Sequence, residues 1–237
     1  KRKIEEPGFY ILHESGNNFI NLVIDKGETI LIKVDIRSLA KTYEVEGSEN
    51  SKLLYQYELF TSKNNKKVDV LSQAYENNKH NPRFIEIKDS LDQEFTKILN
   101  EQKKTVKDFL KKNITSLASL IVINRRFREH VVVSENDDFI YFDMLDKTLT
   151  KLYPTNKHTI DNHLRTEIIR KEKEEESLAN IRLAKGKKIP FFSMFSINGD
   201  TVNSDEFKNK YCIIYFWASF NASSRLLNQQ LISIYKK

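Results

Sequence analysis

The spacing of apolar residues changes at Gly47, and this change constrains the fold more than any other feature. Before Gly47, short segments rich in Ile, Val and Phe are separated by turn residues, which is typical of strands. The turns at Ser15–Asn18 and Asp25–Glu28 each contain a glycine that supplies positive φ. Residues 1–47 are therefore predicted to form an antiparallel β-meander, part of a sandwich or barrel. Its strands are FYILHE, NFINLVID, TILIKVD and TYEVEG, the last at residues 42–47.

Residues 48–184 show helical spacing instead. A first apolar series from Leu54 to Tyr75 has a polar interruption at Ser62–Lys67. A longer helix follows, with Asn81 as its N-cap and Pro82 at its first position. Its apolar stripe is broken at Gln102 alone. We expect it to end near Asn113, which tolerates the left-handed conformation of a C-cap.

Three more helices are predicted in this region. Thr115 or Ser116 caps the apolar segment SLASLIVINRRF, which is expected to be buried. Ser134 or Asn136 caps a helix that stops before Pro154, and a last helix covers about 155–183. This last helix carries the mixed charge run RKEKEEES at Arg170–Ser177. We interpret the run as solvated helix and a connector rather than as an interaction tail.

From Lys185 the pattern changes again, and residues 185–237 form the third predicted domain. Asn198-Gly199 predicts a hairpin turn between two strands, and Ser204 can cap the short helix DEFKN. The continuous apolar run Cys212–Phe216 predicts a central strand buried on both faces, and a helix follows it. The fold class is therefore α+β: a β-rich domain at 1–47, a helical region at 48–184, and a hairpin, strand and helix at 185–237.

Composition excludes several classes of protein. The net charge is +6, but 39 basic residues are diluted by 33 acidic ones, so an anion-binding or nucleic-acid-binding function is the weakest alternative. The densest basic patch is Arg125-Arg126-Phe127-Arg128 with His130. It can bind an anionic partner or cap the preceding helix, and we favour the cap. No apolar run approaches the length of a transmembrane helix.

Residues with metal or catalytic chemistry are sparse. The single Cys212 excludes an internal disulfide, a CxxC pair and a zinc cluster, and its expected role is that of a small buried hydrophobe. His158 and His163 are five residues apart, a poor fit to the i,i+4 spacing of a metal pair, and are expected at the surface. Glycine-rich phosphate loops and a GxSxG elbow are absent from the sequence. We therefore predict no cofactor and no metal.

The segment IPFFSMFSINGDTVNSDEFKNKYCIIYFWASFNASSR resembles the start of the thioredoxin-like family of bacterial cell-envelope thiol-disulfide oxidoreductases. The similarity covers Ile189–Arg225 and is most specific at Phe216-Trp217-Ala218-Ser219, which lead into the active-site helix of that family. Upstream, PGFYILHESGNNFINLVIDKGETILIKVD resembles the β-rich domain that precedes many such proteins, and the next segments resemble their helical linker.

The departures from the family pattern concern its chemistry. The resemblance places the two family cysteines on Asn221 and Ser224, and the aromatic residue before them on Phe220. Thiol-disulfide exchange requires a thiolate nucleophile, and neither Asn nor Ser supplies one. Asn221 has a structural interpretation as the N-cap of the next helix. The motif remnant is Trp217, Ala218, Ser219, Phe220 and Arg225, with no catalytic residue.

The resemblance also has implications for the completeness of the C-terminal domain and for the location of the protein in the cell. A thioredoxin fold needs further strands, one with a cis-proline loop, so we expect the domain to be partial. There are three alternatives: the chain is trimmed, it is a natural remnant, or a second chain completes the sheet. The sequence starts KRKIEEPGFY, without Met, which favours a processed or trimmed product. We expect a redox-inactive protein of the periplasm or cell envelope. It would bind or scaffold an unknown protein, or self-associate through the strand Tyr211–Phe216. The alternative is a partial or degenerate thiol-disulfide oxidoreductase.

Overall fold

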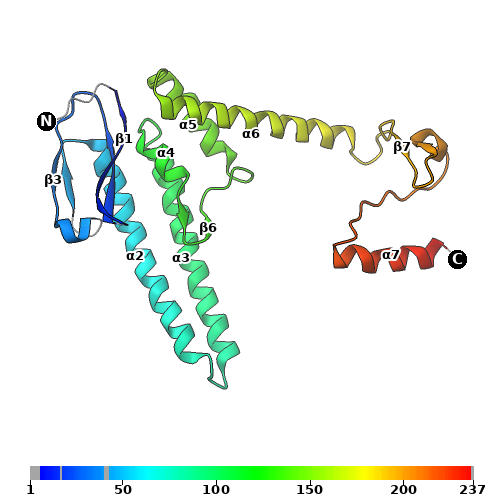
Figure 1. The fold of residues 1–237 in the computed structure, drawn as a ribbon, viewed down its shortest axis with the longest axis horizontal. Coiled ribbons are helices and arrows are strands. Elements are labelled where there is room, and N and C mark those ends of the chain that lie inside the picture. Colours follow the sequence, from blue (N-terminus) through cyan, green and yellow to red (C-terminus); the bar gives the residue numbers. More distant parts are fainter. Residues whose placement is uncertain (1–5, 17, 40–42, 236–237) are drawn as a thin grey trace. The chain divides into compact units, whose positions relative to one another are not determined.

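The computed structural model describes residues 6–16, 18–39 and 43–235, and it confirms an α+β protein (Figure 1). The chain divides into two compact units, residues 1–173 (unit 1) and 174–237 (unit 2). Unit 1 combines the β-rich segment with most of the helical region. Within the described residues, each sheet is a single antiparallel pair of strands, so the expected sandwich or barrel is absent there.

Two hairpins form the β-rich part of unit 1. Strand β1 (Gly8–Ser15) pairs with β2 (Asn18–Ile24), with Gly8 opposite Ile24 and a register shift between His13 and Ser15. Strand β3 (Leu31–Lys33) pairs with β4 (Glu44–Glu46), and the short helix η1 (Ile36–Ser38) follows β3. Asn17 of the predicted first turn and Thr42 of the predicted fourth strand lie outside the described residues.

The predicted meander is wrong because the outer edge of β2 is bonded to a helix instead of to β3. The Ser51 hydroxyl donates to the Val23 carbonyl over 2.8 Å and accepts from the Val23 amide over 3.0 Å. The Ser48 hydroxyl donates to the same carbonyl over 2.9 Å. These contacts occupy backbone groups that a third strand would need. The N-terminus of helix α2 therefore takes the role expected of a strand.

The long helices α2 (Glu49–Asn78) and α3 (Phe84–Lys112) pack against each other as an antiparallel hairpin (Figure 1). The predicted interruption at residues 62–67 does not occur. Asn64 is fully buried within α2 and donates its side-chain amide to the Gln102 side-chain oxygen over 3.0 Å. Gln102 in turn donates to the Thr61 hydroxyl over 2.9 Å. The polar breaks in the two apolar stripes are thus partners across one interface.

The ends of α3 differ from the expectation in detail. The helix begins at Phe84, two residues after Pro82, because the Asn81 side chain accepts from the Arg83 amide over 2.9 Å and forms a turn before it. Asn113 does follow the last helical residue, but its φ of −116° is not left-handed. Its backbone amide binds the Phe109 carbonyl over 2.9 Å, so this carbonyl is satisfied without a glycine-like conformation.

Shorter elements close unit 1. Helix α4 (Ala118–Ile123) precedes a small hairpin of β5 (Arg126–Phe127) and β6 (His130–Val131), and α5 (Phe139–Leu152) and α6 (Lys157–Arg182) follow. Ser116 caps before α4, as predicted, by accepting from the Ala118 amide over 3.1 Å. Ser134 accepts from the Asp137 amide over 3.3 Å before α5. Asn156, which the sequence analysis missed, accepts from the amides of His158 and Thr159 before α6.

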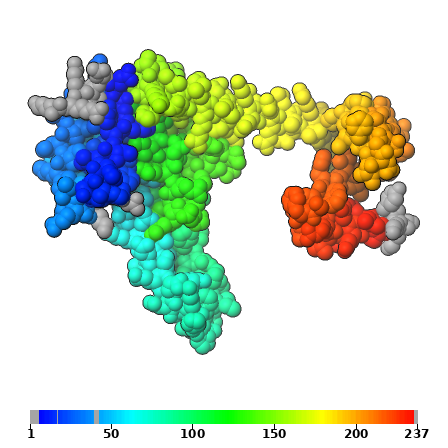
Figure 2. Space-filling view, in the orientation of Figure 1, coloured from blue at the N-terminus to red at the C-terminus, as the bar shows by residue number. Residues whose placement is uncertain are grey.

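Unit 1 has two hydrophobic clusters. The helical cluster lies among α2, α3, α4 and α5, and it buries the predicted segment of α4 almost completely. The β cluster lies between the hairpins and η1. Figure 2 shows that the tip of the α2–α3 hairpin projects away from these clusters, and its residues Val70 and Ile85 are exposed. Fully buried side chains of the helical cluster include Leu54, Val106, Leu117, Val122, Phe127 and Leu149.

Unit 2 begins inside the charge run of α6. Lys171–Ser177 is mostly solvated helix, as predicted, but Arg170 at the start of the run is only 24% exposed and pairs with Asp143 and Asp146 of α5. Strands β7 (Ser193–Phe195) and β8 (Thr201–Asn203) form the expected hairpin, with Gly199 at φ +87°. Helix η2 (Ser204–Phe207) is capped at Asn203, one residue earlier than predicted. The backbone amide of Asn203 donates to the Glu206 carboxylate over 2.7 Å. Helix α7 (Ala222–Tyr235) completes the described part of the unit.

Candidate functional site

Among the described residues, the segment expected to be the central strand of unit 2 has no strand partner. Residues 211–218 carry no regular secondary structure, and Tyr211, Ile213 and Phe216 are 110%, 78% and 90% exposed. Cys212 is exposed too, so the prediction of a buried core cysteine is wrong. The physical reason is that, among the described residues, no adjacent strand pairs with this backbone and no apolar layer covers its side chains.

The turn that resembles an active site is organised around a helix N-terminus. The Asn221 side-chain oxygen accepts from the Ser224 amide over 3.0 Å, which confirms Asn221 as the N-cap of α7. The Arg225 guanidinium donates to the Ser219 carbonyl over 2.8 Å, and the Tyr215 hydroxyl donates to the Ser224 carbonyl over 3.3 Å. These bonds fix the turn, but residues 216–225 include no thiol, carboxylate or imidazole. The observed contacts orient the start of α7.

Apolar side chains of this region face water. Trp217 is 55% exposed and Phe220 is 89% exposed, whereas Ala218 is half-buried and Ser219 is exposed. Exposed apolar residues continue along α7 at Leu226, Leu227, Ile232 and Ile234. Large exposed apolar patches usually mark interaction sites, so these residues are candidates for one. We call residues 211–217 the open segment.

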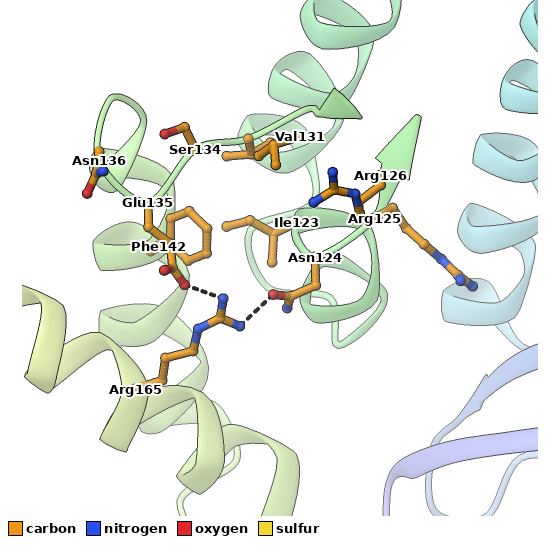
Figure 3. A pocket seen from close by; sticks show the side chains of 11 residues that line it. Ile123, Asn124, Arg125, Arg126, Val131, Ser134, Glu135, Asn136, Phe142 and Arg165 are labelled. Atoms are coloured by element: carbon orange, nitrogen blue, oxygen red, sulfur yellow. Dashed lines mark hydrogen bonds and ion pairs between the residues drawn. The ribbon is translucent and has the colours of Figure 1, made fainter. Parts of the chain in front are cut away.

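A second candidate site is a pocket in unit 1 of about 340 Å³, which we call the arginine pocket. Figure 3 shows the Arg165 guanidinium of α6 between two partners from different elements. It pairs with the Glu135 carboxylate and donates to the Asn124 side chain over 2.7 Å. The other residues that line the pocket are Ile123, Arg125, Arg126, Val131, Val133, Ser134, Asn136 and Phe142.

The basic patch around Arg126 was predicted to cap the C-terminus of α4, and this prediction is wrong for its side chains. The last carbonyls of α4 accept backbone amides, including that of Arg125. The Arg125 guanidinium lies 3.7 Å from Glu58, and Arg128 pairs with Asp69, so both side chains reach α2 instead. Arg128 adopts a left-handed φ of +52° in the turn of the β5–β6 hairpin. The local helix-end argument failed because α2 offers carboxylates within reach.

The two histidines are not simple surface residues. His158 stacks on Phe9 with ring centroids 4.0 Å apart, and burial lowers its pKa. The His163 Nδ1 atom lies 2.9 Å from a carboxylate oxygen of Asp146, which is buried in α5. His163 belongs to α6 and Asp146 to α5, so no local spacing in the sequence could have revealed this pair.

This histidine belongs to a mixed-charge cluster. Ligand atoms of Asp146, His163 and Glu167 lie within 4.8 Å of one another, a spacing compatible with a metal ion. The Arg170 guanidinium contacts Asp146 over 3.2 Å and pairs with Glu167. It therefore already supplies the positive charge that the carboxylates require. A metal ion would have to displace this arginine, so we interpret the cluster as a tie between α5 and α6.

A partly buried carboxyl group, that of Glu58, lies where the β cluster meets α2. Glu58 accepts from the Tyr43 hydroxyl over 2.9 Å, and burial raises the pKa of both groups above their usual values. The hydrogen bond from Tyr43 and the charge of Arg125 lower the pKa of Glu58 but do not offset the burial. The Glu58 side chain is 27% exposed, and its partners among the described residues are Asn21, Tyr43 and Arg125, so we interpret it as a structural site.

Comparisons with known proteins add no assignment. Among the described residues, no helix is long and apolar enough to cross a membrane. The sequence matches no family model and no curated protein, and the fold matches no solved structure.

Proposed function

We propose that this chain is a redox-inactive relative of the cell-envelope thioredoxin-like proteins and acts in binding or scaffolding. The observation that carries the proposal is the Asn221–Ser224 contact. At the place where the resemblance puts a reactive cysteine pair, an amide side chain caps α7 instead. The helix start is preserved and the nucleophile is replaced. The envelope location rests on the resemblance.

Redox chemistry is disfavoured by the number and place of sulfur atoms. A thiol-disulfide cycle needs a thiolate that attacks a disulfide and a second thiol that resolves the mixed disulfide. The sequence has one cysteine, Cys212, which lies on the open segment, nine residues before the N-cap position. It does not share the helix N-terminus that would lower the pKa of a thiol.

Binding is favoured by the open segment, and we infer that a second copy of this chain pairs with it. Residues Tyr211–Phe216 carry no charge and no proline, and they combine aromatic with β-branched side chains. Such a segment readily adds to another strand when its backbone groups are unpaired. Two copies in antiparallel register present the same surface to each other, as a two-fold symmetric interface requires. The chain would assemble through this strand.

The redox part of the proposal is tested by restoring the missing pair. In the variant N221C/S224C/C212S, the cysteine at 221 occupies the N-cap and the one at 224 lies one turn further. We expect the pair to form an intramolecular disulfide and the thiol at 221 to have a pKa below the ordinary value of about 8.5. The matched control is Q230C/S233C/C212S, which places a pair with the same spacing in the C-terminal half of α7, away from the helix N-terminus. Thiolate absorbance against pH measures both.

Two outcomes would count against the redox assignment. If the thiol at 221 titrates like that at 230, the turn lacks the local electrostatics of an active-site helix, and the relationship is not supported. If the unmodified chain reduces insulin disulfides above background and C212S abolishes this, the protein is an oxidoreductase. We expect no reductase activity in either the unmodified chain or C212S.

Self-assembly is tested by the concentration dependence of mass in light scattering after size exclusion. We expect the unmodified chain to form dimers or larger species and I213D to remain monomeric. I197D is the matched control, because Ile197 is fully exposed in the β7–β8 turn of the same unit and lies outside the open segment. A monomer for the unmodified chain at all concentrations, or equal loss of association in I197D, contradicts pairing through this segment.

A further inference from the structure

The turn between β7 and β8 contains the only Asn-Gly pair in the sequence, Asn198-Gly199. Asn198 is exposed, and its side chain has no hydrogen-bond partner among the described residues. Gly199 lies in the left-handed region at φ +87°, and a Cβ atom built on it would meet no atom within 4 Å beyond its chain neighbours. A side-chain amide that is free of contacts therefore stands next to a backbone nitrogen that no side chain shields.

These two groups can react with each other without an enzyme. When the Gly199 amide loses its proton to water, its nitrogen can attack the side-chain carbon Cγ of Asn198. The new bond joins this nitrogen to Cγ, and the bond from Cγ to Nδ2 breaks. The departing nitrogen takes up a proton from water and leaves as ammonia. Water then opens the cyclic imide at either carbonyl, which gives aspartate, or isoaspartate with the backbone running through Cγ. Nothing is oxidised or reduced.

Other asparagines that precede a small residue have their side chains held in place. Asn50, before a serine, is 7% exposed, and its side-chain amide donates a hydrogen bond over 2.7 Å inside unit 1. Asn203, also before a serine, forms the capping box of η2. Asn221, before an alanine, accepts the amide that it caps at the start of α7. In each case a hydrogen bond must break before Cγ can reach the next nitrogen, whereas Asn198 has no such protection.

The reaction requires the turn to open, and the hairpin permits it. The Gly199 amide donates to the Ser196 carbonyl over 3.0 Å, and this bond must break before the nitrogen can react. Strands β7 and β8 have three residues each, pair only with each other among the described residues, and leave β7 exposed along its length. An isolated two-stranded hairpin is marginally stable, so its turn opens at a small cost in free energy.

We propose that Asn198 is a site of spontaneous deamidation, at which the chain converts its own β7–β8 turn to aspartate or isoaspartate with water as the only other reactant. Either product adds a negative charge to the turn, and isoaspartate also adds a methylene carbon to the backbone. The longer connection then disturbs the pairing of Phe195 with Thr201 across the hairpin. It also loosens the bond from the Ser204 amide to the Phe192 carbonyl, which ties η2 to the start of the hairpin.

The test incubates the full chain in mildly alkaline and in mildly acidic buffer and samples it over time. Peptide mass spectrometry gives the deamidated fraction at each asparagine, and methylation by an isoaspartyl methyltransferase distinguishes isoaspartate from aspartate. We expect Asn198 to convert faster than Asn50, Asn203 and Asn221. Conversion should also be faster in the alkaline buffer, where more of the Gly199 amide is deprotonated. N198Q should lose the signal, because a glutamine side chain must close a larger ring.

A222G is the matched control, because it creates a second Asn-Gly pair at Asn221, whose side chain caps α7. We expect Asn221 in A222G to convert about threefold or more slowly than Asn198, since one hydrogen bond lowers the population of the free side chain by about this factor. Circular dichroism checks that the variant keeps its helix content. If A222G has lost helix, S204G makes the same comparison at Asn203, which the capping box of η2 holds.

Three results would overturn the proposal. If Asn198 converts in the chain unfolded by urea but not in the folded chain, the turn protects the pair instead of exposing it. Equal conversion of Asn198 and of the capped asparagine in the control variant would mean that the structure selects no site. An undiminished isoaspartate signal in N198Q would place the reaction at another residue.

Discussion

The paired amides of Asn64 and Gln102 give a sharp prediction about the stability of unit 1. Both residues are 0% exposed, and the Asn64 side-chain oxygen has no hydrogen-bond partner among the described residues. Gln102 is therefore the partner that satisfies the buried Asn64 amide, and it also donates to Thr61. Substituting Gln102 by Leu removes both bonds while keeping a side chain of similar size at the helix interface.

The expected loss follows from what remains behind. The Asn64 amide would keep no partner in the core, and an orphaned buried polar group costs about 1–3 kcal/mol. The Thr61 hydroxyl can turn to a carbonyl of its own helix, so it adds less than the roughly 1 kcal/mol of a typical hydrogen bond. We expect Q102L to lower the free energy of unfolding by about 2–3 kcal/mol. The double variant N64L/Q102L leaves no orphan and should return to within about 1 kcal/mol of the original chain.

The assay is urea unfolding followed by circular dichroism at 222 nm, with the free energy taken from midpoint and slope. Q93L is the matched control, because Gln93 is an exposed residue of the same helix. The reasoning is refuted if Q102L is as stable as Q93L. It is refuted equally if N64L/Q102L is less stable than Q102L, because the second substitution should relieve the orphaned amide.

Three further substitutions test other parts of unit 1. G47A should destabilise by about 3 kcal/mol or more in urea unfolding, because a Cβ would lie 2.0 Å from the Thr29 carbonyl oxygen at a φ of +85°. S51A should cost about 2 kcal/mol, because it removes two bonds to the Val23 backbone. The folded-state pKa of Glu58 is raised, so its contribution to stability is present below the unfolded pKa and is lost as pH rises through the folded pKa. The stability of E58Q relative to the original chain should therefore increase between pH 4 and pH 7, and a constant difference would contradict this.

Elements defined by local chemistry were predicted from the sequence. The Asn198-Gly199 turn needs a residue with positive φ, and Gly199 provides it. Ser116 and Asn221 have side chains that accept from an amide two or three residues ahead, so a cap can be inferred without knowledge of the fold. The apolar stripe of α3 identified its buried face for the same reason, since a period of 3.6 depends on the helix alone.

Features that depend on distant residues were missed or misread. The polar stretch around Asn64 was predicted as a break because its partner lies 38 residues away. The strand at Cys212–Phe216 was predicted from composition, but a strand needs a neighbour, and the described residues supply none. The arginine pocket combines parts of three helices and a hairpin, so no contiguous motif indicated it. The side-chain partners of Arg125 and Arg128 in the basic patch likewise lie on α2.

The serines at the start of α2 have a consequence for solubility. A strand on the outside of a sheet normally offers its backbone as a template to other chains, and proteins avoid this with charges, prolines or covering elements. Here Ser48 and Ser51 occupy the Val23 amide and carbonyl from inside the same molecule. The apolar strand β2 is thereby shielded against recruitment into aggregates, and amide exchange at Val23 should require opening of the α2 N-terminus. The same chain thus carries one edge blocked by hydroxyl groups and one segment whose backbone has no such protection.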